Sequence, residues 1–268
     1  MANERKVSRY RRLGEGSSII LNLLTVVAII ALWWAATHSG WIKPLFLPRP
    51  EAIWKAFLQA WSGDFDNNTL LGHFGWSMMR VFGAFALAVA IGVPVGIAMG
   101  VSRIARGIFD APIEFYRPLP PLAYLPLMII WFGIGELSKI LLIFLACFAP
   151  VALAARAGVR SASQEQIQAA LSMGATQGQV VRHIVLPAAL PEILVGLRIG
   201  MGVGWTTLVA AEMMAASSGL GQMVLNASNF LRTDVVVLGI IIIGLVAYGF
   251  EMVMRALETW LVPWRGRV

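Results

Sequence analysis

Long blocks of apolar residues dominate the chain, and they are apolar on every side instead of at every third or fourth position. Such blocks are typical of helices surrounded by lipid or by other apolar helices. About 20 mainly apolar residues cross a bilayer, and about 16 suffice where flanking groups snorkel. The charge-free stretches that qualify are residues 19–41, 81–102, 118–135, 140–155, 199–216 and 235–250. The pattern predicts an all-α membrane protein with six transmembrane helices.

Composition supports this interpretation. The 268 residues are 58% hydrophobic and only 13% charged, whereas about 25% of residues are charged in ordinary soluble domains. Soluble globular and disordered classes are therefore excluded. The net charge of +7 does not indicate nucleic-acid binding, because the basic residues flank apolar blocks and do not line one face.

The basic residues also predict orientation. Counted on alternate sides of the six spans, 15 of the 21 lysines and arginines fall on the side that holds both termini. Cytoplasmic loops carry this excess, so we expect a multi-pass protein of the bacterial inner membrane with residues 1–18 and 256–268 in the cytoplasm. Arg117, just before Pro118, is interpreted as a snorkelling anchor at a span end.

Two spans carry a small residue at every fourth position. These residues are Ala84, Ala88, Gly92, Gly96 and Gly100 in the second span, and Gly196, Gly200 and Gly204 in the fifth. Small side chains let helix backbones approach closely in lipid. Static helix packing is the simpler interpretation, and an interface that slides during a transport cycle is the alternative.

The loop of residues 156–198, after the fourth span, is unusually long and less apolar than its surroundings. Ser163 followed by Gln166, and Thr176 followed by Gln179, are both capping-box patterns at helix starts. We therefore expect two short helices here, with one apolar face each. A loop of this length usually has a structure or function of its own.

The same loop contains a turn signal and a stop signal. Gly174, between the two helices, suits a left-handed turn, and Pro187 is expected to end the second helix at Leu186. The loop is thus predicted to form a helix-turn-helix elbow facing the cytoplasm. An amphipathic elbow lying on the membrane surface is the alternative.

The amino-acid sequence of this elbow resembles the EAA loop of ABC importer permeases. The matching positions are Ala169, Ala170, Gly174, Ile184, Leu186 and Pro187, with Gln168 where the family usually has a glutamate. The resemblance implies a coupling helix that docks on a cytoplasmic ABC ATPase dimer, a periplasmic substrate-binding protein, and a second copy of the chain. An amide at Gln168 loses any ion pair with the ATPase but keeps hydrogen bonding.

The resemblance extends beyond the elbow. Residues 92–100, 114–135 and 186–212 are similar to the nitrate, sulfonate and taurine branch of these permeases, and closest to its taurine members. The implied type I permease core spans residues 70–255, with residues 19–41 as a preceding transmembrane helix. The implied activity is ATP-driven uptake of taurine or a related small sulfonate, with aliphatic sulfonates or nitrate as alternatives.

Intrinsic catalysis is not expected. The chain lacks the GxxxxGK[ST] phosphate loop of an ATPase, and its three histidines are too dispersed for a metal site, so no cofactor is predicted. Energy must then come from a separate subunit.

Residues near the end of the fifth span are candidates for the translocation path or a gate. Glu212 is the one acid well inside an apolar context, and intramembrane acids are costly and often functional. Glu212 either lines the path or is held structurally. Thr206 and Thr207 either face the path or form hydrogen bonds with the backbone of their own helix. Gly219 and Gly221 indicate a helix break that would suit a gate.

Two rival functions remain. A secondary carrier driven by an ion gradient needs ionisable residues in several spans, and this chain has essentially one. A regulatory membrane subunit without a path would not stimulate ATP hydrolysis in response to substrate.

Overall fold

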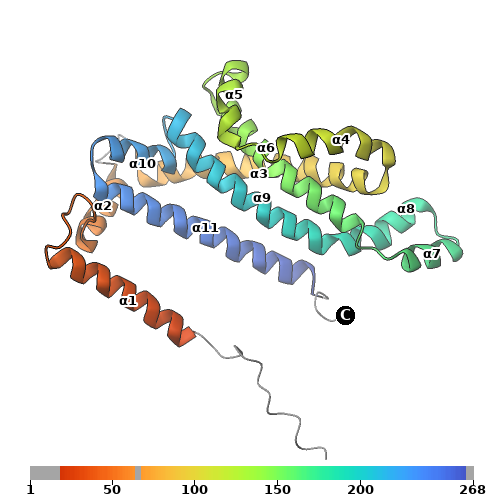
Figure 1. Ribbon diagram of the computed structural model, residues 1–268, viewed down its shortest axis with the longest axis horizontal. Coiled ribbons are helices and arrows are strands. Elements are labelled where there is room, and N and C mark those ends of the chain that lie inside the picture. Colours follow the sequence, from red (N-terminus) through yellow and green to blue (C-terminus); the bar gives the residue numbers. More distant parts are fainter. Residues whose placement is uncertain (1–18, 64–67, 264–268) are drawn as a thin grey trace, which may run out of the picture.

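The structure is a computed structural model, and it describes residues 19–63 and 68–263. The expected cytoplasmic stretch 1–18 and the last five residues of the expected cytoplasmic C-terminus lie outside the described residues. The described part consists of helices and their connections (Figure 1).

In the described ranges, five helices are long and apolar enough to cross a membrane. They are α1 (Ile19–His38), α3 (Leu70–Val101), α6 (Glu136–Val159), α9 (Leu186–Ala215) and α11 (Thr233–Leu261). The all-α membrane fold is therefore confirmed, whereas the count of six spans is not.

The third expected span, residues 118–135, forms short pieces. After α4 (Arg103–Tyr116) come a 3₁₀ turn, η1 (Pro121–Tyr124), and the eight-residue α5 (Leu125–Phe132). Eight residues rise about 12 Å, well short of the ~30 Å hydrocarbon layer. The prolines that precede and interrupt this segment remove backbone donors and limit each helix to a few turns.

The long helices extend beyond the charge-free blocks that predicted them. Arg80 lies inside α3, Lys139 inside α6 and Arg198 inside α9, each with a carboxylate partner. Because a paired charge is tolerated where an isolated one is not, the helices continue through residues that a search for charge-free runs treats as ends.

Helix α6 is enclosed between α3 and α9, which run alongside it (Figure 1). A Cβ atom added at Gly96 would collide with the Ala152 carbonyl oxygen, and one at Gly196 with the Ala154 Cβ. Both small-residue stripes therefore face α6 within one chain. This geometry supports static helix packing as their role.

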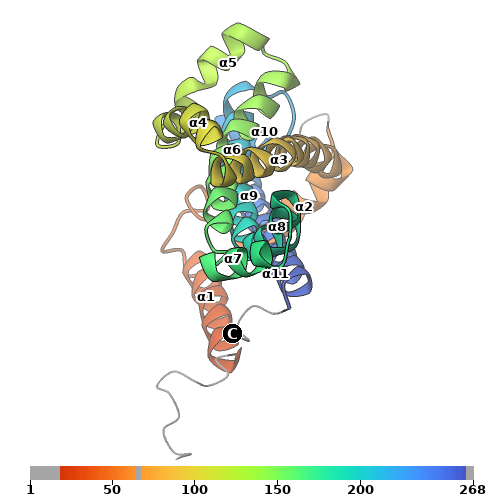
Figure 2. The same cartoon turned by 90° about the vertical axis from the view of Figure 1, so that its right-hand side faces the viewer.

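The two ends of this bundle differ. One end carries α7 (Gln164–Ser172) and α8 (Gln177–Val180), and we call it the elbow end. The other carries α2 (Pro50–Ser62) and α10 (Leu220–Asn229), and we call it the α10 end (Figure 1). Helix α1 lies to one side of the bundle (Figure 2), with Trp33 near its C-terminal end packed against the core and most of its other described side chains exposed.

The glycine contacts generate a stability prediction. Gly96→Ala should lower the free energy of unfolding by about 1–3 kcal/mol, because the new methyl group meets backbone that cannot move aside cheaply. Gly83→Ala in the same helix meets open space and should be neutral or stabilising by up to about 1 kcal/mol. Denaturant titration of both variants in detergent micelles measures this difference. Equal stability of the two variants would contradict the proposed close packing.

Candidate functional site

Two groups of residues are candidates for function: the helical elbow at one end and a largely buried charge cluster at the other. In the elbow, the Ser163 hydroxyl accepts a hydrogen bond from the Gln166 backbone N–H at 3.2 Å, which caps α7. At α8 the Thr176 hydroxyl accepts from the Gln179 N–H, and the Gln179 side chain accepts from the Thr176 N–H. The two predicted helix starts are therefore confirmed, and the second is a complete capping box.

The predicted turn at Gly174 is also confirmed. Its φ is +85°, in the left-handed region that favours glycine, and its N–H donates to the Leu171 carbonyl at 3.0 Å. The Ala175 N–H donates to the Ala170 carbonyl at 3.0 Å, which closes the end of α7. Space around the Gly174 Cα is open, so backbone conformation, and not crowding, is what requires glycine here.

A small apolar cluster fixes the elbow to the bundle. It consists of buried side chains from the end of α6 and from both arms of the elbow: Val159, Ala162, Ala170, Val180 and Val185. The Ser161 hydroxyl adds a 2.8 Å hydrogen bond to the Ala188 carbonyl. The elbow is thus packed against the end of the bundle through one apolar face.

The expected stop at Leu186 is wrong. Helix α8 continues through a π-helical turn, η2 (Val181–Val185), directly into α9, so the helical run extends from Gln177 to Ala215. Pro187 lies in the first turn of α9, directly after Leu186, whose N–H bonds to the Val181 carbonyl in the wider π pattern. Proline at that position begins the α-helical segment without ending the helix.

The structure brings most of the predicted elbow residues together. Ala169, Ala170, Ile184 and Pro187 line one shallow surface hollow of about 490 Å³. Gln168 is exposed on the same arm, whereas Leu186 is half-buried where α9 begins. Met173 at the tip is 83% exposed, so the elbow presents apolar side chains to its surroundings.

At the α10 end, Glu212 is buried and fully engaged. Its carboxylate accepts hydrogen bonds from the Ser77 hydroxyl at 2.8 Å, the Arg80 guanidinium at 2.7 Å and the Gly221 N–H at 3.0 Å. Only 1% of Glu212 is exposed. These contacts connect α3, α9 and the start of α10.

Arg80 is the centre of this cluster, and its side chain has no exposed surface. Besides Glu212 it binds Glu136 through two nitrogens, at 2.5 and 2.9 Å, and donates to the Ser218 carbonyl at 2.6 Å. Lys139 donates to the same Glu136 at 3.0 Å. Two cations and two carboxylates from three helices therefore neutralise one another; Arg80, Lys139 and Glu212 are buried, and Glu136 is partly exposed.

The loop between α9 and α10 is shaped around the Glu212 carboxylate. Gly219 has a φ of +127°, and a Cβ atom there would overlap the carboxylate. A Cβ atom at Gly221 would collide with the Val209 carbonyl oxygen. The Gly219 N–H also donates to His73 Nδ1 at 3.1 Å. The expected helix break is present, and glycine is required at both positions.

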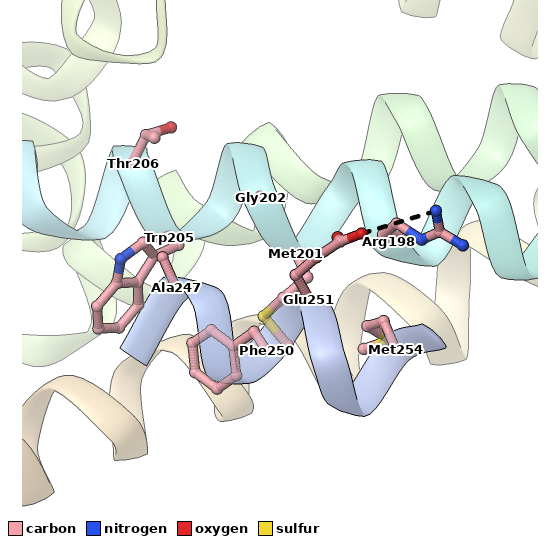
Figure 3. A pocket seen from close by; sticks show the side chains of 9 residues that line it. All are labelled: Arg198, Met201, Gly202, Trp205, Thr206, Ala247, Phe250, Glu251 and Met254. Carbon is pink, nitrogen blue, oxygen red and sulfur yellow. Dashed lines mark ion pairs between the residues drawn. The ribbon is translucent and has the colours of Figure 1, made fainter. Parts of the chain in front are cut away.

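Thr206 and Thr207 both donate to the Val203 carbonyl of their own helix, at 2.9 and 2.8 Å. Thr206 is exposed and Thr207 is buried. Thr206 also lies at the edge of a 240 Å³ pocket between α9 and α11, where the Arg198–Glu251 ion pair is found (Figure 3). Trp205 and Phe250 line this pocket with their rings in an edge-to-face contact, and the Thr206 hydroxyl points away from them (Figure 3).

Sequence reasoning found Glu212 but missed its partners. The charge count places Arg80 and Lys139 among the six basic residues on the side opposite the termini, and no sequence pattern singles out Glu136. One signal was available: each of these charges lies within a turn or two of an apolar block instead of in a polar loop. Which charges meet depends on contacts between residues more than 50 positions apart, such as Arg80 with Glu136 and with Glu212.

The cluster predicts a large stability effect. Arg80→Met should lower the free energy of unfolding by about 3–5 kcal/mol, because Glu212 then stays buried without its cation. The control Arg255→Met breaks the exposed Arg255–Glu251 pair and should cost less than about 1 kcal/mol. The double variant Arg80→Met/Glu212→Met should be more stable than Arg80→Met alone. Denaturant titration measures the stability of all three variants. A loss of stability in Arg80→Met no larger than that in Arg255→Met would refute the role of Arg80 as the cation that neutralises Glu212.

Curated proteins match this chain over nearly its full length, among them the following three. The chain is 53% identical to the taurine transport system permease protein TauC of Escherichia coli, over 93% of this chain and 91% of that one. It is 36% identical to the putative aliphatic sulfonates transport permease protein SsuC of Bacillus subtilis, over 91% and 87%. It is 30% identical to the nitrate import permease protein NrtB of Synechocystis, over 91% and 90%.

The fold is similar to that of a solved transporter, an inward-facing MetNI methionine ABC transporter. The TM-score is 0.57 at 22% identity, over 70% of this chain and 95% of that one. The family model for binding-protein-dependent transport system inner membrane components matches residues 92–266. This range includes the elbow, most of the bundle and Glu212. The chain is therefore a multi-pass membrane protein that belongs to the family of binding-protein-dependent transport system inner membrane components.

Proposed function

We propose that this chain is the permease subunit of an ATP-driven ABC importer that moves taurine, or a related small sulfonate, from periplasm to cytoplasm. Family membership supports the transport role, and the 53% identity to a taurine permease favours taurine. Aliphatic sulfonates and nitrate are the alternative substrates, because the SsuC and NrtB relatives match over similar lengths at lower identity.

The observation that carries this proposal is the continuous helical run from Gln177 to Ala215. Its 39 residues rise about 58 Å, from the elbow to the Arg80–Glu212 cluster. A force applied to the elbow therefore acts directly on the opposite end of the bundle. A coupling subunit needs this kind of connection between an energy source on one side and a gate on the other.

The elbow surface suits a protein partner. Ala169, Ala170, Ile184 and Pro187 form a hollow, and Met173 and Leu171 add exposed apolar surface. We infer that a separate cytoplasmic ATPase dimer docks here and supplies the energy, since the chain has no phosphate loop of its own. Gln168, exposed beside the hollow, contributes hydrogen bonds and no charge.

The remaining partners are inferred from membership in the same family. A periplasmic binding protein would deliver the substrate at the α10 end, and a second copy of the chain would complete the pathway. The bundle leaves large apolar side chains exposed on α4 and α5, including Phe115 at 76% and Ile130 at 77%. Lipid and a second copy are the surroundings that such a face requires.

Within this mechanism we assign Glu212 to the gate, and not to substrate binding. Its carboxylate oxygens are occupied by Ser77, Arg80 and Gly221, which join the α9–α10 loop to α3. Opening at the α10 end would require this cluster to loosen. The same pairing argues against a secondary carrier, because Arg80, Lys139 and Glu212 are already paired within the described bundle.

Orientation is tested with reporters that are active only in the cytoplasm. The clustering of basic residues predicts activity when the reporter follows Arg160, at the elbow end, and no activity when it follows Asn226, at the α10 end. Reporter activity at Asn226 would reverse the assignment of the two ends.

Coupling is tested at the elbow turn. Gly174→Val should strain the left-handed backbone by about 1–3 kcal/mol and weaken ATPase docking roughly 5- to 150-fold. We expect normal membrane levels, reduced retention of the ATPase and little ATP-driven sulfonate uptake in proteoliposomes. Gly178→Val, in the same elbow but in open space and without a positive φ, is the matched control and should retain uptake. Full uptake by Gly174→Val with the ATPase bound would refute the coupling role.

A further inference from the structure

A groove of about 410 Å³ lies beside α6, away from both groups of residues described above. Its walls come from the end of α4, from η1, and from the middle of α6 and α9. We call it the Arg117 groove, and the residues that matter for its chemistry are Arg117, Tyr116, Tyr124, Leu145, Pro150 and Val203. Most of the wall is apolar, and Arg117 is the one charged residue on it.

The groove lies at the middle of the bundle's height. Three contacts follow α4 along α6: Asp110 pairs with Arg156, Ile113 packs with Ala149 and Ala152, and the Tyr116 hydroxyl donates to the Leu145 carbonyl at 3.4 Å. Leu145 is nine residues into the 24-residue α6, or about 14 Å from one end and about 21 Å from the other. Arg117 follows Tyr116 directly and is therefore near mid-membrane depth.

This depth corrects the interpretation of Arg117 as a snorkelling anchor at a span end. An anchor reaches the interface with its charged head, whereas Arg117 lies several turns from either end of α6. Its side chain is nevertheless 59% exposed, and Glu114, 3.8 Å from it, is 55% exposed. Exposed charges at this depth are too costly against hydrocarbon. This face must therefore border a water-accessible or protein-lined space.

Arg117 and Arg80 have contrasting surroundings. Arg80 is completely buried and saturated by two carboxylates, so it has no donor left for a ligand. Arg117 has a single ion pair in the described part of the chain, at 3.8 Å and open to solvent. Such pairs are weak, and an incoming anion displaces them readily. The guanidinium fork also matches the oxygen geometry of an oxyanion.

We propose that the Arg117 groove is a transient binding site for the anionic head of the transported substrate inside the membrane. Arg117 donates to the sulfonate oxygens, Tyr124 supplies a further hydroxyl donor, and the apolar wall contacts the carbon chain. The volume suits a small molecule. This inference rests on the proposed sulfonate transport and adds the residue that would hold the substrate between the two sides.

The test uses the complete transporter, with its ATPase and binding protein, in proteoliposomes supplied with radiolabelled taurine. Arg117→Gln should lower the uptake rate at least tenfold while ATP hydrolysis stimulated by the loaded binding protein persists. Arg117→Lys should recover part of the uptake, because it restores the charge without the planar fork. The matched control is Arg103→Gln, an exposed arginine at the other end of α4, which should transport as the unmodified protein does.

A milder variant keeps the proposal testable if Arg117→Gln does not assemble. Tyr124→Phe removes one hydroxyl, retains the ring and should lower uptake severalfold. Unchanged uptake in both Tyr124→Phe and Arg117→Lys would overturn the groove assignment, as would unchanged uptake in Arg117→Gln. Absence of ATP-driven taurine uptake by the unmodified complex, with alkanesulfonates and nitrate also not transported, would instead refute the proposed function.

Discussion

The close approach of α3 and α9 to α6 is the constraint on which the rest of this structure depends. In lipid, burial of apolar surface adds little attraction between helices, so contact between backbones has to hold them. Glycines on α3 and α9 permit this contact with the α6 backbone. The contacts also set the register of the three helices, and that register brings Arg80, Glu136 and Glu212 to one end.

Sequence reasoning succeeded where structure is decided locally. The helix starts at Ser163 and Thr176 and the turn at Gly174 each depend on a few neighbouring residues, and all three were predicted correctly. Long apolar blocks located four of the long helices of the bundle and α1. The family resemblance, which rests on fixed residues at fixed spacing, led to the right family.

Most of the incorrect predictions concern features that depend on contacts between residues distant in the sequence. The segment after Arg117 is apolar enough to span, but its prolines divide it into short pieces. The charge-free runs begin too late, after Arg80 and Lys139. Carboxylates from two other helices neutralise Arg80, and Glu136 of the same helix pairs with Lys139. The position of Arg117 is not encoded locally either, because it follows from how α4 packs along α6.

The π-helical turn at Val181–Val185 has a geometric consequence for the elbow. In this turn the Leu186 N–H bonds to the Val181 carbonyl, five residues earlier, so the turn contains one residue more than an α-helical turn. Each residue of an α-helix advances the side-chain direction by about 100° around the axis. Compared with an uninterrupted α-helix, the surplus residue therefore turns the residues before it by about 100° relative to the faces of α9 that pack on α6. One additional residue in the connecting turn thus changes the direction in which the exposed surface of the elbow faces, while the packing faces of the membrane helix stay in place.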